Sequence, residues 1–198
     1  MRKKKQKGDN NLLDDKKTSL YNIVTSCYNE HRRSNKEAYM KINHMIQEFE
    51  GEREKEIRGI FSSIVILQNR LQTIFDNANE ILTLKQFMLL TMIKYSDEIT
   101  TFTHLGNLLG SSRQNIKKIA TSLEKKEFIT INQEINNKRN TALQLTEKAD
   151  AFLGAINELH TEKLNSIFAD YTQEEIHIFY KLITKLYAGV EREENGHG

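Results

Sequence analysis

Apolar residues recur at helical spacing along most of this chain, and polar clusters separate the stretches. Two apolar stripes between residues 12 and 49 flank the polar segment 31–36, which predicts two helices with a break between them. A third stripe, spaced alternately three and four residues apart, is formed by Ile57, Ile60, Ile64, Leu67, Leu71 and Ile74. This heptad-like spacing is typical of a helix packed along another helix, either in the chain's own core or in a second copy.

The middle of the chain predicts a compact helical core. Thr83 followed by Gln86 forms a capping-box pattern at the start of a very apolar helix over residues 84–95. A short strand at 99–101 and a short helix ending at Gly110 are expected next. The leucines of this short helix that should face inward are Leu105, Leu108 and Leu109.

A second helix is predicted directly after the turn at Gly110, over residues 113–124. Its apolar side chains fall on one face at the 3.6-residue period: Ile116, Ile119, Ala120 and Leu123. Its other face is polar and carries Gln114, Lys117, Lys118 and Thr121. A short helix, a turn containing glycine and an amphipathic helix together are the pattern of a helix-turn-helix.

The polar residues at the start of this helix suit the reading of DNA. Arginine pairs with guanine, and glutamine and asparagine pair with adenine, in the major groove. Lysines neutralise phosphates, and serine hydroxyls donate to them. The candidate DNA-binding residues here are Ser111, Ser112, Arg113, Gln114, Asn115, Lys117, Lys118 and Thr121. The alternative is a merely solvated polar face.

A β-hairpin is predicted next, because residues 128–132 and 142–146 alternate between apolar and polar. The polar segment 136–140 between them places Lys138 and Arg139 at the tip. A hairpin in this position is a wing, and its cations would reach the negative potential of the minor groove.

Two long helices complete the predicted fold, one over residues 149–168 and one begun by a capping box of Thr172 and Glu175. Their apolar stripes exceed what a small core requires, so we interpret them, with the helix at 57–75, as a dimerisation layer. Its predicted contact residues are Ile57, Ile60, Ile64, Leu67, Ile176, Phe179, Leu182, Ile183 and Leu186. The final residues, 191–198, are expected to fray.

Composition narrows the class of protein. The chain has 198 residues, no proline and nine glycines, which disfavours a fold rich in strands and tight turns. A single cysteine excludes an internal disulfide. No apolar run is long enough to span a membrane, and none follows the basic N-terminal residues as it would in a secretory signal. The cytoplasm is therefore the expected compartment. Residues 81–146 carry nine basic and five acidic side chains, whereas residues 147–198 carry five and ten. The excess of basic side chains in residues 81–146 indicates that this segment binds a polyanion.

Other chemistry finds little support in the sequence. The six histidines lack metal-ligand spacing, and no phosphate-binding loop, nucleophile motif or dinucleotide fingerprint occurs. We therefore expect no catalytic residues, no metal, no cofactor and no enzyme. Cys27 is interpreted as a small core residue, with a redox sensor as the alternative.

The ordered motifs resemble those of the MarR family of bacterial winged-helix regulators. They read Leu82-Thr83-x-x-Gln86-x-x-x-Leu90, then Ser112-Arg113-x-x-Ile116 and Leu123-Glu124, then Asn137-Lys138-Arg139 and Leu143-x-Leu145-Thr146-Glu147-Lys148. The resemblance covers about residues 57–190. It implies a homodimer joined by its terminal helices on a palindromic operator, with Arg139 as the wing cation, and a small-molecule effector. The DNA contacts that it implies on the recognition helix are Ser112, Arg113, Gln114, Asn115, Lys117 and Lys118.

Two positions depart from the family's pattern. Asn137 stands where an acid usually orients the wing arginine, which leaves a weaker hydrogen bond in place of an ion pair. Glu127 stands where a glycine usually ends the recognition helix, so we expect this helix to exit by another conformation.

Taken together, the sequence predicts a mainly α fold with a small β-hairpin wing, in which a winged helix-turn-helix is joined to a helical dimerisation layer. The predicted function is a homodimeric, sequence-specific regulator of transcription, a repressor that binds double-stranded DNA. The alternatives are a helical module whose winged helix binds protein, and a thiol-responsive regulator acting through Cys27. The predicted segments are a disordered basic tail (1–11), a helical arm (12–50), a dimerisation helix (51–80), the winged helix-turn-helix (81–146) and C-terminal dimerisation helices with a frayed tail (147–198).

Overall fold

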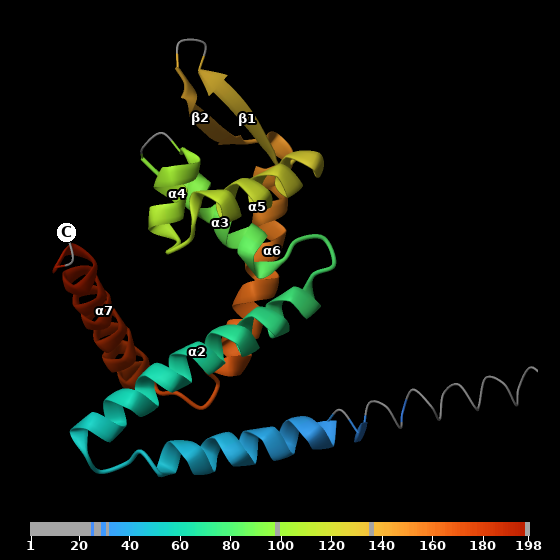
Figure 1. Ribbon diagram of the computed structural model, residues 1–198. Coiled ribbons are helices and arrows are strands. Elements are labelled where there is room, and N and C mark those ends of the chain that lie inside the picture. Colours follow the sequence, from blue (N-terminus) through green and yellow to red (C-terminus); the bar gives the residue numbers. More distant parts are fainter. Residues whose placement is uncertain (1–24, 26–28, 31, 98–99, 135–136, 197–198) are drawn as a thin grey trace, which may run out of the picture. The chain divides into compact units, whose positions relative to one another are not determined.

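The computed structural model describes residues 25, 29–30, 32–97, 100–134 and 137–196. The predicted basic tail, the first apolar stripe of the arm and Cys27 lie outside these residues. The chain divides into two compact units, residues 1–69 and 70–198, and each is considered by itself. In chain order (Figure 1), the named elements are α2 (Arg53–Ala78), α3 (Leu84–Tyr95), α4 (Phe102–Leu108), α5 (Arg113–Lys125), β1 (Ile129–Glu134), β2 (Asn137–Leu145), α6 (Glu147–Ile167) and α7 (Gln173–Gly196).

In the first unit, residues 32–47 form one continuous helix ahead of the turn that leads into α2. The predicted break at 31–36 is therefore wrong for residues 32–36. Residues 32–36 contain neither glycine nor proline, and arginine and lysine propagate a helix readily, so a cluster of charges alone does not end one. The turn contains Gly51, whose φ of 102° is readily adopted by glycine.

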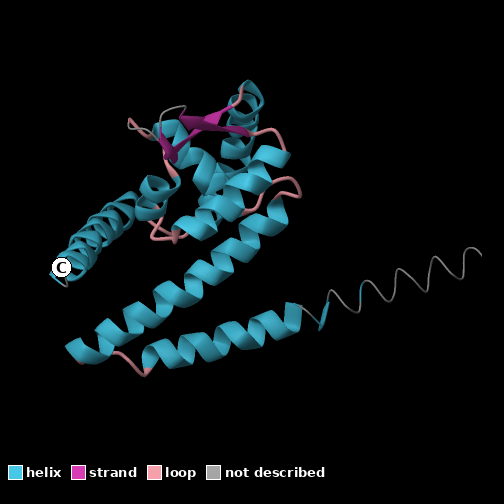
Figure 2. Cartoon of the chain, turned by 45° about the horizontal axis from the view of Figure 1, so that its top comes forward, coloured by secondary structure: helices cyan, strands magenta, loops and turns pink. Residues whose placement is uncertain are grey.

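The core of the second unit is assembled from α3, α4, α5, the hairpin and α6. Its fully buried large side chains are Leu89, Leu90, Leu105, Ile116, Leu123, Ile129, Leu143 and Leu153. The predicted helix at 84–95 is confirmed, and Thr83 and Gln86 form both hydrogen bonds of the capping box. Figure 2 shows the short two-stranded sheet, in magenta, with helices of this core next to it.

Thr101 is the N-cap of the short helix α4, and its hydroxyl accepts the backbone N–H of His104. Leu105 is fully buried as predicted, but Leu108 is 51% exposed, so its inward assignment is wrong. A helix of seven residues makes about two turns, and its core-facing side is occupied by Phe102 and Leu105, three residues apart, so Leu108 points toward solvent. The strand expected at 99–101 is reduced, within the described residues, to an isolated bridge between Thr101 and Ala142.

The hairpin pairs β1 with β2 in antiparallel register, from Ile129 opposite Leu145 to Gln133 opposite Thr141. The next pair joins Glu134 to Asn137, so β2 advances four residues while β1 advances one. Lys138 and Arg139 therefore lie in an irregular part of β2 and not at the tip of the hairpin, where the sequence pattern predicts them. A bulge of this kind bends the strand locally.

The helices after the wing form as predicted, and α7 begins with a capping box in which Thr172 N–H donates to Glu175 Oε2 at 2.8 Å. The Thr172 hydroxyl donates to the same oxygen at 2.9 Å, and the two hydrogen bonds lower the pKa of the exposed Glu175 carboxyl. The helix runs to Gly196, so the expected fraying of residues 191–196 is wrong. No residue of α7 is buried, and that exposed helix includes the predicted apolar seam. The proposed segment boundaries remain predictions.

Candidate nucleic-acid interface

The start of α5 is fixed by local hydrogen bonds. Ser112 is the N-cap, and its hydroxyl accepts the backbone N–H of Asn115 at 3.2 Å. The Asn115 amide donates to Ser111 Oγ at 2.8 Å, which holds this side chain against the turn. Because a primary amide carries two N–H donors and a carbonyl acceptor, Asn115 retains the groups needed for contact with a base.

The turn before α5 depends on two glycines. Gly110 adopts a φ of 57°, a left-handed conformation that glycine reaches without steric penalty. Gly106 lies so close to the turn that a β-carbon there would meet the Ser111 carbonyl oxygen at 2.6 Å. The Ser111 N–H also donates to the Gly106 carbonyl at 2.8 Å, so α4 and the turn are in direct contact. This close approach sets the position at which α5 begins.

The two faces of α5 differ sharply. Ile116, Ala120 and Leu123 are completely buried, and Ile119 packs at the edge of the core, as predicted. The opposite face is exposed at Arg113, Gln114, Lys117 and Lys118. Burial of one face by the core therefore fixes which side chains α5 presents to solvent.

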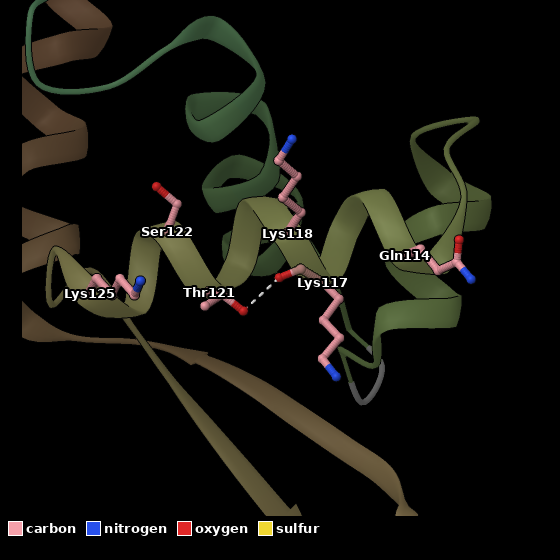
Figure 3. Close-up of a pocket in the computed structure, with 6 residues that line it drawn as sticks. All are labelled: Gln114, Lys117, Lys118, Thr121, Ser122 and Lys125. Carbon is pink, nitrogen blue, oxygen red and sulfur yellow. Dashed lines mark hydrogen bonds between the residues drawn. The ribbon is translucent and has the colours of Figure 1, made fainter.

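A hollow of about 470 Å³ lies along this exposed face and is lined by Gln114, Lys117, Lys118, Thr121, Ser122 and Lys125 (Figure 3). In that view Lys117 and Lys118 extend to opposite sides of the helix, so their ammonium groups flank the hollow. The lining contains three lysines and no carboxylate. Positive charge over a shallow concave surface attracts a polyanion.

Sequence reasoning missed Lys125 and Ser122 in this hollow. Lys125 lies seven residues after Lys118, two helical turns further along the same face, so the 3.6-residue period could have identified it. Ser122 gave no such signal, because its hydroxyl accepts from the Gln86 side-chain amide at 3.0 Å, a contact across 36 residues. Thr121, which was predicted, is half-buried and its hydroxyl donates to the Lys117 carbonyl at 2.9 Å.

The end of α5 corrects the expectation for Glu127. This residue has a φ of 62°, so α5 ends through a left-handed residue even without the usual glycine. The Phe128 N–H donates to the Leu123 carbonyl at 3.0 Å and the Glu127 N–H to the Glu124 carbonyl at 2.9 Å, which together form a Schellman motif. Phe128 and Leu123 are both buried, and their burial in the core offsets the strain at Glu127.

The remaining predicted residues lie outside the hollow. Lys138 and Arg139 belong to the backbone of β2. The dimerisation candidates on α2 and α7 are exposed by 36–59%, apart from the half-buried Ile183. Exposed isoleucine, leucine and phenylalanine along two helices form apolar surface of the kind that another protein chain covers.

Two kinds of site find no support among the described residues. No group of three or more histidine, cysteine, aspartate or glutamate side chains there could hold a metal ion. No helix in the described part of the chain has the length and apolar character needed to cross a bilayer.

Comparison with known proteins identifies the domain. Residues 82–141 match the model of the MarR family. A MarR protein from Peptoclostridium difficile superposes with a TM-score of 0.62 at 25% identity, over 68% of this chain and 88% of that one. Staphylococcus aureus MarR in complex with salicylate and kanamycin gives a TM-score of 0.62 at 15% identity, over 75% and 99% of the two chains. The S. aureus MepR–DNA complex gives 0.56 at 15% identity, over 70% and 99%.

The family model and the shared fold agree with the motifs along the sequence. The model spans α3, α4, α5 and most of the hairpin, which are the elements that build the helix-turn-helix and its wing. Residues 82–141 therefore form a winged helix-turn-helix domain that matches the MarR family.

Proposed function

We propose that this chain regulates transcription by binding double-stranded DNA in a sequence-specific manner through α5 and the wing. The observation that carries the proposal is the exposed face of α5, where three lysines line a hollow on a helix whose other face is fixed in the core. A rigid helix with a cationic, amide-bearing surface matches what the major groove requires. The S. aureus MepR relative is described in complex with DNA.

Different roles are proposed along α5. Arg113, Gln114 and Asn115 lie in its first turn, from which side chains reach base edges when a recognition helix enters the major groove. Lys117, Lys118 and Lys125 carry the charge that neutralises phosphates. The Ser112 hydroxyl accepts the Asn115 N–H and keeps its own proton for a phosphate oxygen. Arg139 of the wing is assigned to the minor groove.

We propose a homodimer that binds a palindromic operator and represses by occupying it. The apolar seam on α7 consists of Ile176, Phe179, Leu182, Ile183 and Leu186, all exposed except the half-buried Ile183. Apolar residues that recur every three to four positions are typical of a helix packed along another helix. Two copies joined around a two-fold axis present two copies of α5, and a palindrome offers each the same half-site.

Release by a small-molecule effector is the finer part of the proposal. The S. aureus MarR relative is described with salicylate and kanamycin, which motivates the same mode of control here. To act, such an effector must bind the state that cannot engage DNA more tightly than the state that can.

Selection from a randomised duplex pool with the full-length chain tests the proposal. The chain should enrich a palindrome, and the log of the binding constant should fall linearly with the log of salt concentration. Three phosphate-binding lysines in each of two protomers give a slope of roughly −5. Failure to enrich any duplex, or binding that ignores salt, would contradict the proposal and favour a protein partner for the winged helix.

A further inference from the structure

A polar cluster at the C-terminal end of α5, which shares Ser122 with the hollow, joins three segments of the second unit. The Lys126 ammonium donates to the Ile81 carbonyl at 2.6 Å and to Gln86 Oε1 at 3.1 Å. The Gln86 amide donates to Ser122 Oγ at 3.0 Å, and its Oε1 also accepts the Thr83 N–H at 3.1 Å. Gln86 is only 8% exposed, so this amide is a buried group whose acceptor oxygen is fully used.

The same cluster continues to the last turn of α2. Asp76 Oδ1 accepts the N–H of Leu84 at 2.6 Å, which ties the end of α2 to the start of α3. Asn79 Oδ1 accepts the N–H of Ile81 at 2.7 Å, which orders the connection to which Lys126 binds. The end of α2, the start of α3 and the end of α5 are thus joined through one set of hydrogen bonds.

These bonds constrain α5 in a way that its apolar face does not. Burial of Ile116, Ala120 and Leu123 sets which face of α5 meets the core, but these contacts are non-directional and define the rotation of the helix about its axis less sharply than hydrogen bonds do. A hydrogen bond weakens steeply as its donor–hydrogen–acceptor angle departs from linearity. The bond between Gln86 and Ser122, and the bonds from Lys126 to Gln86 and to the Ile81 carbonyl, therefore fix the rotation of α5. A rotation of α5 would change which of its polar side chains face a groove.

We propose that Gln86 and Lys126 are positioning residues that set the rotation of α5 and so determine base specificity, although neither touches DNA. We call Gln86, Ser122, Lys126 and the Ile81 carbonyl the α5 clamp. This inference rests on the proposed DNA-binding function and adds that Lys126, unlike its neighbour Lys125, is not a phosphate contact. Lys125 lines the hollow, whereas the Lys126 ammonium is held by two acceptors elsewhere.

The matched pair Lys126→Met and Lys125→Met tests this assignment in the full-length chain, with the duplex selected from the randomised pool and a scrambled duplex of equal composition. Lys126→Met should lower the ratio of selected to scrambled affinity about tenfold, with the salt slope unchanged. Lys125→Met should weaken both duplexes by the same factor and make the slope shallower by about 1 per half-site.

Gln86 provides the second arm. Gln86→Leu should lower the specificity ratio as Lys126→Met does, because it removes the shared acceptor. Gln86→Glu should keep the specificity ratio of the unmodified chain, since its carboxylate accepts from Thr83, Lys126 and the Ser122 hydroxyl. If Gln86→Leu fails to fold, Lys126→Met decides the matter, because that side chain is only half-buried.

Each other outcome has a definite meaning. An unchanged ratio in Lys126→Met overturns the clamp while leaving the proposed function intact. A slope change equal to that of Lys125→Met overturns it too, by making Lys126 a phosphate contact. If the unmodified chain binds selected and scrambled duplexes equally, sequence-specific recognition fails, and the role of the clamp fails with it.

Discussion

Glu127 and Lys148 form an ion pair of 3.2 Å at the point where α5 gives way to the hairpin. The same ammonium donates to the Lys126 carbonyl at 2.8 Å and lies 5.1 Å from the centre of the Phe128 ring. A cation that binds the last carbonyl of a helix also interacts favourably with the helix dipole. Lys148 thereby stabilises a helix end that uses glutamate in a conformation suited to glycine.

The pair leads to a prediction about stability. Glu127→Gly should raise the free energy of unfolding by about 0.5–1 kcal/mol, because glycine removes the strain of a left-handed residue. The lost ion pair subtracts little, since the Glu127 side chain is 82% exposed and such pairs contribute about 0–1 kcal/mol. Urea unfolding measures the change. Glu127→Gln keeps the strain and removes the charge, and it should be neutral or slightly destabilising. A destabilised glycine variant would show that the ion pair outweighs the strain.

Two substitutions on α5 separate reading of bases from binding of phosphates. Arg113→Ala should weaken the selected duplex by about 1–3 kcal/mol and relax preference at one base position. Lys117→Ala should weaken all duplexes alike and make the salt slope shallower. Fluorescence anisotropy with selected and single-base-substituted duplexes distinguishes these effects. Identical behaviour of the two variants across every duplex would refute the assigned roles.

What the sequence predicted well rests on local rules. The capping box of Thr83 and Gln86 and the buried face through Ile116, Ala120 and Leu123 follow from spacing within one helix. The exposed face of α5 follows from the same period, so the sequence alone predicts four of the six residues that line the hollow: Gln114, Lys117, Lys118 and Thr121. The predicted break at 31–36 failed because a charged cluster was treated as a helix breaker.

The rest depends on contacts between residues far apart in the chain. Gln86 forms hydrogen bonds with Ser122 and Lys126, 36 and 40 residues further along the chain, and no pattern within one helix predicts such contacts. Glu127 lies in a left-handed conformation next to Lys148, 21 residues further along the chain, whose ammonium contacts both the Glu127 carboxylate and the Phe128 ring. The shift of register before Lys138 arises from pairing between the strands rather than from alternation within either.

The close approach of α4 to the turn makes Gly106 sensitive to substitution. Gly106→Ala should destabilise the fold by about 1–3 kcal/mol, because its β-carbon would meet a backbone oxygen that cannot move alone. DNA affinity should fall further than stability requires, since the turn sets the start of α5. Gly154→Ala on α6 is the matched control, with no atom within 4 Å of the added carbon, and should stabilise by about 0.5–1 kcal/mol. Thermal unfolding of both variants checks the contrast, and equal shifts would refute it.

His160 predicts a pH dependence of stability. His160 is 7% exposed, and its ring lies edge-on to Phe75 and Phe87, with centroid distances of 4.7 and 4.3 Å. Burial lowers the pKa of His160 below its ordinary value of 6.5. The unfolded chain therefore binds a proton at a pH where the folded chain does not, so stability falls as the pH drops from about 6.5 through the folded pKa.

His160→Phe isolates this contribution, because phenylalanine keeps an aromatic ring beside both neighbours and cannot be protonated. Urea unfolding at several pH values between 7.5 and 5 should show a smaller loss of stability on acidification in the variant than in the parent chain. Parallel curves for the two proteins would show that His160 is solvated well enough to titrate normally.

The exposed seam of α7 gives the most direct test of self-association. Leu182 is 59% exposed and lies within one turn of Phe179 and Leu186 on the same apolar side. In a dimer that buries this side, Leu182→Asp places a charge in apolar surroundings, which costs several kcal/mol unless the helices separate. Sedimentation velocity should then show a monomer where the parent chain is a dimer, and binding to a palindrome should weaken to the level of a single half-site.

The neighbouring Lys181 provides the control for this experiment. It is exposed and lies away from the seam by the helical period, so Lys181→Glu changes the charge of α7 without touching the apolar side. This variant should remain dimeric, with a melting temperature that rises with protein concentration as expected for a folded dimer. If Leu182→Asp also stays dimeric, the two copies associate through another surface, and the exposed leucines and isoleucines of α7 must be covered by something other than a second copy.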